Sequence, residues 1–428
     1  MRILLEAPIL TRSGYGEHAR LVFRALKSIS GADIYIKALQ WGNTSWTFNH
    51  QDEIEEIRTL NDKFLRYEAV CKAEKKEEEY DIQVHVGIPS EFEKRAPYSV
   101  CVTAGIETDR VSFDWVSKTH NGMNKIIVPS EHSADGFRKT KYEVLNKTNQ
   151  TQSVVGCNCP VEVVPYPVKK IKSEDIDINL VTPFNFLTVA LLGHRKNIEN
   201  SLKWFVEEFK NNNQVGFVLK TSTSRSSILD RQQTKKYLTS FLKSLGPREC
   251  KVYLLHGDLT DSQVHSLYEN PKIKAYVTTT HGEGFGLPIF EAAYSGVPVI
   301  ATDWSGHLDF LSGPFKESNK TKNKKLFARV NYELNEVSSE AIWPGIIDKD
   351  SRWAYPLETD FKSKLNKVYN NYGMYKKWAQ SLKSHLEKTH LESIILEKMR
   401  QAILPQEILD SFEKKSEWEK ELSEIEIL

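Results

Sequence analysis

Short apolar runs recur along the first part of the chain, and segments with helical spacing lie between several of them. The runs are RILLEAPIL (2–10), DIYIKAL (33–39), DIQVHVG (81–87), SVCVTAG (99–105), KIIVPS (125–130) and VEVVPYP (161–167). Residues 11–28 predict a glycine-containing loop followed by an amphipathic helix, and helical spacing is also seen in residues 114–123 and 131–140. Buried strands that alternate with helices predict a parallel sheet with both faces covered.

A second series of apolar runs follows, again interleaved with helical spacing. It comprises FLTVALLG (186–193), QVGFVLKTS (214–222), KVYLLHG (251–257), KAYVTTT (274–280) and VPVIATD (297–303). We therefore predict an α/β protein of two Rossmann-like domains, residues 1–168 and 183–385, that face each other across a cleft. The polar stretch 169–182 would link them as a hinge. The charged helical segment 386–428 would form a C-terminal tail packed across both domains.

Composition narrows the class of protein. The chain has 428 residues, enough for two domains, and its net charge of +1 gives no overall electrostatic reason to bind nucleic acid or membrane. The N-terminal segment is too short and too soon charged for a signal peptide, and no apolar run approaches the length of a membrane span. Five scattered cysteines indicate a reducing compartment, so we expect a cytoplasmic protein without a transmembrane segment.

The segment THGEGFGLPIFEAAYSGVPVIATD (280–303) carries the most informative chemistry. A strand, a glycine-rich loop and a helix are predicted, with Pro288 in the first helical turn. Glycines let a ligand approach the backbone, and a helix start favours an anion or a sugar oxygen. Glu283 and Glu291 would grip hydroxyl groups there; the alternative is a capping glutamate and a surface glutamate.

The stretch EGFGLPIFEAAYSGVPVIAT (283–302) resembles the GT-B glycosyltransferases, specifically the retaining family 4. This resemblance implies a GT-B fold in which Glu283 contacts the donor sugar and Glu291 binds the ribose hydroxyls of the nucleotide. It also implies that LLGHRKNIENSLKWF (191–205) supplies Arg195 and Lys196 to neutralise the diphosphate. Backbone groups beside the sugar and diphosphate would come from Gly284, Phe285, Gly286 and Leu287.

Further donor-binding candidates follow from the same resemblance. Lys220 ends an apolar run and is a candidate for the phosphates, and SGYGEHA (13–19) takes the place of a glycine loop that faces the diphosphate. Its candidate residues are Gly14, Tyr15 and Gly16. Many family members carry a histidine where this chain has Ala104 and Gly105. Glu107, just beyond, is either a replacement polar contact and thus a catalytic residue, or part of a surface loop.

The implied reaction is retaining transfer from a nucleoside-diphosphate sugar, expected to be UDP-linked, without a metal or other cofactor. N-terminal phrases such as APILTRSGYGEHAR (7–20) look like those of glycosyltransferases encoded by tailed phages. That likeness implies DNA as a partner, with 5-hydroxymethylcytosine as acceptor in the cytoplasm of the host. The alternatives are a glycan or lipid-linked acceptor, or a catalytically silent module that binds nucleotide sugars.

Several weaker signals have a structural alternative. Trp41, Trp46 and Phe48 would stack an acceptor or simply pack, and the basic stretches 137–148 and 316–325 would contact phosphates or be solvated loops. The pair Cys157 and Cys159 is either a metal site or a plain loop. The acidic tripeptide 175–177 and the histidines at 18 and 85 are expected to be structural.

Overall fold

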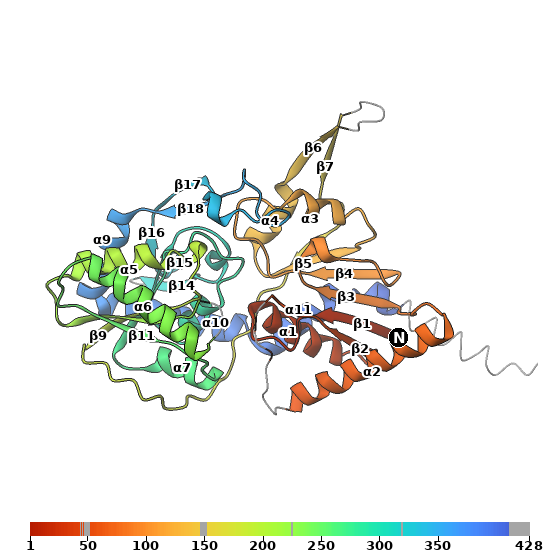
Figure 1. Cartoon of the computed structure of the whole chain (residues 1–428), viewed down its shortest axis with the longest axis horizontal. Helices are drawn as coiled ribbons and strands as arrows, with labels where there is room; N and C mark the ends of the chain where they lie inside the picture. The colour runs from red at the N-terminus through yellow and green to blue at the C-terminus, as the bar shows by residue number, and fades with distance from the viewer. Residues whose placement is uncertain are drawn as a thin grey trace, which may run out of the picture.

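The computed structural model describes residues 1–42, 44, 46, 52–145, 152–223, 226–317 and 320–410. Two lobes lie side by side, each built around one sheet, with the N-terminal lobe in red to yellow and the second lobe in green to blue (Figure 1). Within the described residues each of these sheets has six strands, and all of them run parallel. The prediction of two Rossmann-like domains is therefore confirmed.

The first sheet has the strand order β2-β1-β3-β4-β5-β8. Its strands are β1 (Arg2–Ala7), β2 (Asp33–Ala38), β3 (Ile82–Val86), β4 (Tyr98–Val102), β5 (Lys125–Val128) and β8 (Val161–Val163). The central strands β3 and β5 are buried along their whole length, as expected for a parallel sheet covered on both faces.

The second sheet has the strand order β11-β10-β9-β12-β13-β16. Its strands are β9 (Phe184–Val189), β10 (Val215–Lys220), β11 (Lys251–Leu255), β12 (Ile273–Val277), β13 (Val299–Thr302) and β16 (Ala328–Val330). The chain order reverses between β9 and β12, which are neighbours in the sheet. Ligands of such folds bind beyond the carboxyl ends of the strands at this reversal.

Helices and short hairpins surround the two sheets. In the N-terminal lobe these are α1 (Gly14–Lys27), α2 (Asp52–Glu74), η1 (Pro89–Glu91), α3 (Phe113–Lys118), α4 (Glu131–Lys139) and the hairpin of β6 (Lys141–Leu145) with β7 (Gln152–Gly156). In the second lobe they are η2 (His194–Lys196), α5 (Ile198–Phe209), α6 (Ile228–Ser244), α7 (Asp261–Glu269), α8 (Leu287–Tyr294), η3 (Gly306–Asp309), the hairpin of β14 (Ser312–Glu317) with β15 (Lys320–Lys325), η4 (Ser339–Ala341), the pair of β17 (Tyr332–Glu336) with β18 (Arg352–Pro356), α9 (Glu358–Asn370) and α10 (Tyr372–Thr389). Among the described residues no helix combines the length and apolar character needed to cross a bilayer.

The last described helix returns the chain to the N-terminal lobe. Helix α10 packs against α8 and β14 of the second lobe, and α11 (Glu392–Ile403) then packs against α1. The ammonium of Lys125 on β5 donates to the carbonyl of Ala402 at 2.8 Å, which ties α11 to the first sheet. The predicted boundary at residue 385 falls inside α10, and residues 411–428 of the predicted tail lie outside the described residues.

One predicted helix is shorter than its spacing suggested. Residues 114–123 were expected to be helical, but α3 ends at Lys118. The next residues form turns, and Gly122 has φ +84°, a left-handed conformation that a continuing helix does not use. The apolar spacing extends past the helix because Met123 still reaches the core from the turn.

The contact between α11 and the N-terminal lobe gives a stability prediction. Ile395 is 0% exposed whereas its neighbour Ile394 is 38% exposed. We expect Ile395→Ala to lower the free energy of unfolding by about 2 to 4 kcal/mol, because it removes buried methyl groups and leaves a cavity. Ile394→Ala is the matched control and is expected to change it by less than about 1 kcal/mol. Equal losses for both variants in denaturant titrations would show that α11 is not packed as described.

Candidate active site

The candidate site lies at the carboxyl ends of β9 and β12, where the strand order of the second sheet reverses. The chain leaves β9 into the short helix η2, which presents Arg195 and Lys196. It leaves β12 into residues 278–286, which hold Glu283, and then enters α8. Two loops that are distant in sequence therefore meet at the place where a parallel sheet binds its ligand.

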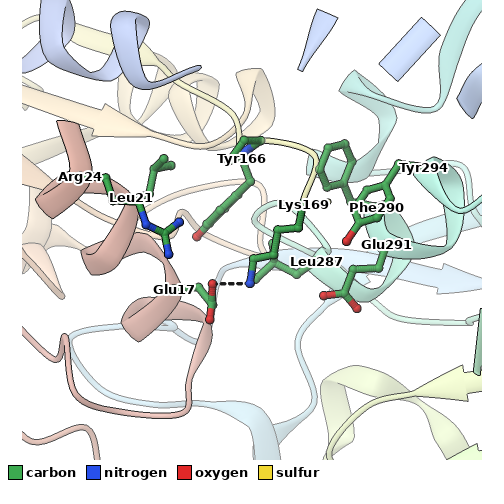
Figure 2. A pocket seen from close by; sticks show the side chains of 10 residues that line it. Glu17, Leu21, Arg24, Tyr166, Lys169, Leu287, Phe290, Glu291 and Tyr294 are labelled. Atoms are coloured by element: carbon green, nitrogen blue, oxygen red, sulfur yellow. Dashed lines mark hydrogen bonds and ion pairs between the residues drawn. The ribbon is translucent and has the colours of Figure 1, made fainter. Parts of the chain in front are cut away.

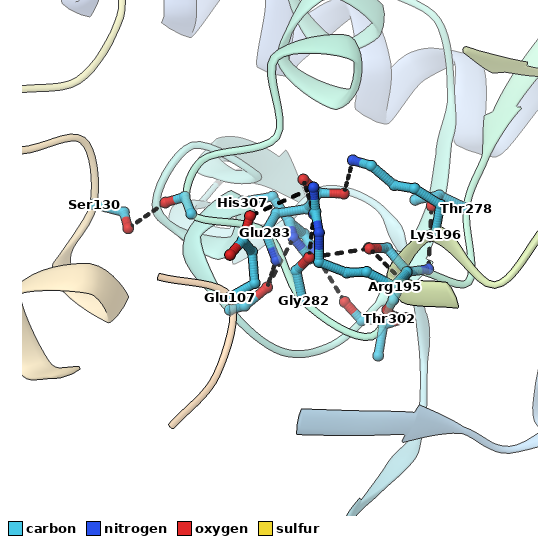
Figure 3. A network of polar contacts seen from close by, with 12 residues as sticks. Glu107, Ser130, Arg195, Lys196, Thr278, Gly282, Glu283, Thr302 and His307 are labelled. Carbon is cyan, nitrogen blue, oxygen red and sulfur yellow. Dashed lines mark hydrogen bonds and ion pairs between the residues drawn. The ribbon is translucent and has the colours of Figure 1, made fainter. Parts of the chain in front are cut away.

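Arg195 and Lys196 converge on the carboxylate of Glu283 (Figure 3). Arg195 Nη1 lies 3.0 Å from one carboxylate oxygen, and Lys196 Nζ lies 2.5 Å from the other. Arg195 Nη2 is also 3.4 Å from the carboxylate of Glu107, which comes from the N-terminal lobe. The four residues assigned from the sequence to catalysis thus form one ion cluster, with two cations and two carboxylates.

Burial and pairing set the charges of this cluster. Loss of hydration would raise the pKa of Glu283, but Lys196 and Arg195 outweigh it and lower that pKa to about 2. Burial lowers the pKa of Lys196, and the neighbouring guanidinium of Arg195 lowers it further. Burial would also lower the pKa of Arg195, yet Glu107 and Glu283 raise it. Glu283 is therefore a carboxylate at neutral pH, held between two cations.

Hydrogen bonds between the backbone of Glu283 and residues 305 and 306 fix the loop around it. The Glu283 N–H donates to Ser305 Oγ at 2.9 Å, and its carbonyl accepts from the Gly306 N–H at 2.9 Å. Gly286 ends the loop with φ +92°, where glycine is favoured, and α8 begins at the next residue with Pro288 in its first turn. The predicted strand, loop and helix are confirmed, and they aim the carboxylate of Glu283 at η2.

The N-terminal lobe touches this loop directly. Ser130 Oγ and Ser133 Oγ donate to the carbonyl of Gly284 at 2.6 and 3.3 Å. A Cβ on Gly284 would lie 2.3 Å from the carbonyl oxygen of Ala104, so only glycine allows this approach. Ser130 and Ser133 were not among the site residues predicted from the sequence. The pattern that could have predicted Ser130 is a serine that follows a buried strand and caps the next helix, as Ser130 caps α4.

Glu291 lies on α8 in a pocket between the lobes (Figure 2). Tyr268 of α7 donates its hydroxyl to Glu291 at 3.0 Å. The pocket encloses about 30 Å³, the room taken by about one water molecule. It is lined by residues from α1, from α8 and from the segment where the N-terminal lobe passes into the linker, namely Glu17, Leu21, Arg24, Tyr166, Pro167, Lys169, Leu287, Phe290, Glu291 and Tyr294.

The two carboxylates of this pocket differ in charge state. Loss of hydration raises the pKa of Glu291 to about 7, although Lys169 and the Tyr268 hydrogen bond act in the opposite direction. Burial also acts to raise the pKa of Glu17, but Lys169 and Arg20 pair with it and lower that pKa to about 2. Glu291 therefore titrates close to neutral pH, whereas Glu17 stays ionised. A pKa shifted this far by burial is a common property of functional sites.

The residues expected to form a glycine loop are instead the first turn of α1. Gly14, Tyr15 and Gly16 follow the cap residue Ser13, whose hydroxyl accepts from the Gly16 N–H at 3.0 Å. The hydroxyl of Tyr15 lies 2.8 Å from that of Thr103, at the end of β4. The helix start thus faces the interlobe region, but its side chains are engaged within the N-terminal lobe.

Two other donor-binding candidates lie apart from the ion cluster. The side chain of Phe285 packs among rings of the core, with its centroid 5.0 Å from Tyr166, so its backbone alone lines the loop. Lys220 Nζ donates to the carbonyl of Gly257 at 2.8 Å, and burial lowers the pKa of Lys220. A separate interlobe contact lies nearby, where the guanidinium of Arg12 donates to the Leu259 carbonyl at 2.9 Å.

The remaining aromatic and histidine candidates from the sequence belong to the N-terminal lobe. The ring of Trp41 lies 4.0 Å from that of Tyr15, Trp46 is partly exposed, and Phe48 lies outside the described residues. His18 and His85 are buried in the N-terminal lobe. In the part of the chain that the structure describes, no three His, Cys, Asp or Glu side chains gather closely enough to hold a metal ion.

The sequence of the second lobe is similar to those of known glycosyltransferases. Residues 172–316 match the model of the family "Glycosyl transferases group 1". The chain is also 28% identical over 216 residues to the UDP-N-acetylglucosamine–peptide N-acetylglucosaminyltransferase GtfA subunit of Streptococcus pneumoniae. That alignment covers 46% of this chain and 40% of the relative, so the chain matches less than half the length of that protein.

Solved structures share the whole architecture. Sucrose-phosphate synthase from Thermosynechococcus elongatus superposes with a TM-score of 0.60 at 13% identity, covering 96% of this chain and all of that one. Anabaena HepE in complex with UDP and glucose superposes with a TM-score of 0.57 at 13% identity, covering 94% of this chain and 99% of that one. The chain has the GT-B fold, and residues 172–316 are similar in sequence to the glycosyl transferases of group 1.

Proposed function

We propose that this protein is a retaining glycosyltransferase that moves a sugar from a nucleoside-diphosphate sugar to an acceptor hydroxyl. The observation that carries the proposal is the convergence of Arg195 and Lys196 on Glu283 at the strand reversal. As the bond between sugar and diphosphate breaks, negative charge grows on the leaving oxygens. Two fixed cations in a partly buried site stabilise that charge without rearranging at the moment of reaction.

The ion cluster suggests an exchange of anions on donor binding. Without a donor, Glu283 and Glu107 neutralise the two cations. The diphosphate takes the place of the Glu107 carboxylate on Arg195 and of the Glu283 carboxylate on Lys196, and Glu283 turns toward the sugar hydroxyls. A buried cation is costly without a partner, so the exchange keeps each cation paired throughout. Glu107 then lies beside the sugar, where the family's histidine is absent.

The nucleotide moiety is assigned to the pocket of Glu291. A carboxylate on α8 accepts hydrogen bonds from the two ribose hydroxyls, and the start of α8 favours the diphosphate. The pocket is narrow, with a volume of about 30 Å³, and we infer that it widens by movement of the lobes when the nucleotide enters. The irregular linker, residues 169–182, lies where a hinge for this motion is needed.

The donor is proposed to be UDP-linked. The pneumococcal relative is named for its use of UDP-N-acetylglucosamine, and HepE was solved with UDP and glucose. Retention follows if the acceptor attacks the face that the diphosphate leaves, with the diphosphate itself taking the proton. In this mechanism Arg195 and Lys196 supply the positive charge on the diphosphate, and no side chain has to act as nucleophile.

For the acceptor we propose the hydroxyl of 5-hydroxymethylcytosine in DNA. The support on this chain is a basic hairpin, β14 with β15, which exposes Lys316, Lys320 and Lys322. Exposed lysines on this hairpin suit contact with a phosphate backbone. A glycan or lipid-linked acceptor would leave the donor chemistry unchanged.

The two cations provide the direct test of the activity. We expect Arg195→Ala and Lys196→Ala each to lower kcat by about 10²- to 10³-fold, because each removes a fixed charge that stabilises the leaving group. Release of UDP from a panel of UDP-sugars measures the rate, and circular dichroism checks the fold. Lys210→Ala, at an exposed position after α5, is the matched control and should leave the rate unchanged.

Near-normal turnover in both variants would remove Arg195 and Lys196 from the reaction. If the wild-type protein binds a UDP-sugar but releases no UDP with any hydroxyl acceptor, the protein is a nucleotide-sugar-binding module rather than an enzyme. The anomeric configuration of the product, read by NMR, tests retention separately.

The proposed DNA acceptor has its own test. With a UDP-sugar present, we expect mass shifts of one sugar on duplex DNA that contains 5-hydroxymethylcytosine, and none on the same duplex with cytosine. Replacing Lys316, Lys320 and Lys322 together by glutamine should weaken DNA binding in gel-shift assays and reduce the dependence of affinity on salt, because fewer counterions are released. Sugar transfer to neither duplex would reject this acceptor and leave the donor chemistry intact.

A further inference from the structure

The pocket of Glu291 contains a cation that the proposed mechanism does not use. Lys169 opens the linker between the lobes, and its side chain points into the pocket between α1 and α8 (Figure 2). Its Nζ lies 2.6 Å from Glu17 Oε2 on α1 and 3.5 Å from Asp261 Oδ2 on α7. One ammonium group from the linker therefore contacts both lobes.

Lys169 faces an excess of negative charge. Glu17, Asp261 and Glu291 all act electrostatically on it, from α1, α7 and α8. Of the other cations near this pocket, Arg20 pairs with Glu17, whereas Arg24 pairs with Glu53. Burial would lower the pKa of Lys169, but the carboxylates raise it, so the side chain remains an ammonium ion at neutral pH.

We propose that Lys169 is a positioning residue that keeps Glu291 ionised for the ribose hydroxyls and couples this state to the closed arrangement of the lobes. This inference rests on the proposed assignment of Glu291 to the ribose. An ionised carboxylate accepts hydrogen bonds from both hydroxyls and binds them more strongly than a neutral acid, which can accept fewer. Lys169 favours that state by proximity, without contacting the sugar of the donor.

The surroundings of Glu291 explain why it needs this cation. Burial removes water from Glu291, and the anions Asp261 and Glu17 also work against its ionisation, whereas Lys169 and the hydrogen bond from the Tyr268 hydroxyl favour it. With these groups the pKa of Glu291 is about 7. Glu291 acts electrostatically on Tyr276 and Tyr294, and both phenols stay neutral because burial raises the pKa of each. Within this set, Lys169 is the nearby group whose positive charge favours the carboxylate.

The charge state of Glu291 makes the affinity for the ribose depend on pH. Below a pKa of about 7 Glu291 is protonated, so ribose binding should strengthen as the pH rises through 7. Without Lys169 the pKa of Glu291 is higher, so the affinity for the ribose should rise only at a higher pH. The factor by which affinity falls when Lys169 is removed is therefore largest at pH 6 to 7 and small at pH 9.5, where Glu291 is ionised in both proteins.

The test compares Lys169→Met with Lys170→Met, which removes the neighbouring, exposed lysine. Calorimetry measures the dissociation constant of UDP from pH 6 to 9.5, and the ratio of variant to wild type at each pH cancels the ionisation of UDP itself. We expect Lys169→Met to raise the dissociation constant by about tenfold at pH 6, one pK unit being a factor of ten, and by clearly less at pH 9.5. Lys170→Met should give a ratio near one throughout, and Lys169→Arg should restore most of the affinity.

Other outcomes would overturn the inference. A ratio for Lys169→Met that is constant across the pH range means that the lysine acts only structurally or by attracting the phosphates. If Glu291→Gln keeps the wild-type dependence on pH, Glu291 is not the titrating group. These results leave the proposed function standing, provided that wild type binds UDP and turns over. If wild type binds none of UDP, GDP and ADP at any pH, the proposed function fails together with the inference.

Discussion

The requirement that buried charges be paired governs the centre of this molecule. Glu283 is almost fully buried at the reversal of the second sheet, and it is stable there as a carboxylate because Arg195 and Lys196 lie on its two oxygens. Removing one partner of such a pair typically costs about 3 to 5 kcal/mol. The turn that carries Glu283, the short helix η2 and the ends of β9 and β12 are thereby fixed relative to each other.

The same requirement extends across the two lobes. The N-terminal lobe supplies Glu107 to Arg195, and α1 supplies Glu17 to Lys169 of the linker. The lobes are thus joined by ion pairs in which the protein supplies the carboxylates. The proposed donor would place its own phosphates and hydroxyl groups at the same positions. A ligand that replaces these contacts also changes how the lobes are held, so binding and lobe movement are linked through charge.

Much of the architecture was predictable from local sequence. The apolar runs gave both parallel sheets because a buried strand needs only a few consecutive apolar residues, and Gly286 with Pro288 marked the start of α8. The convergence of Arg195, Lys196 and Glu283 followed from family resemblance and from the meeting of strand ends. Other details depended on packing: α3 ended early in turns, Gly14 to Gly16 became a helical turn, and Lys220 donates to the carbonyl of Gly257.

The sequence by itself determined the two sheets, the shape of the glycine turn and the identity of the charged groups, because these depend on residues close together in the chain. Only the tertiary structure decided which charges meet. Glu17 and Lys169 are 152 positions apart, and Arg195 and Glu283 are 88 apart, so no local pattern encodes either pair. The pKa of Glu291 was equally out of reach of the sequence, since it depends on burial between two lobes and on a lysine from the linker that joins them.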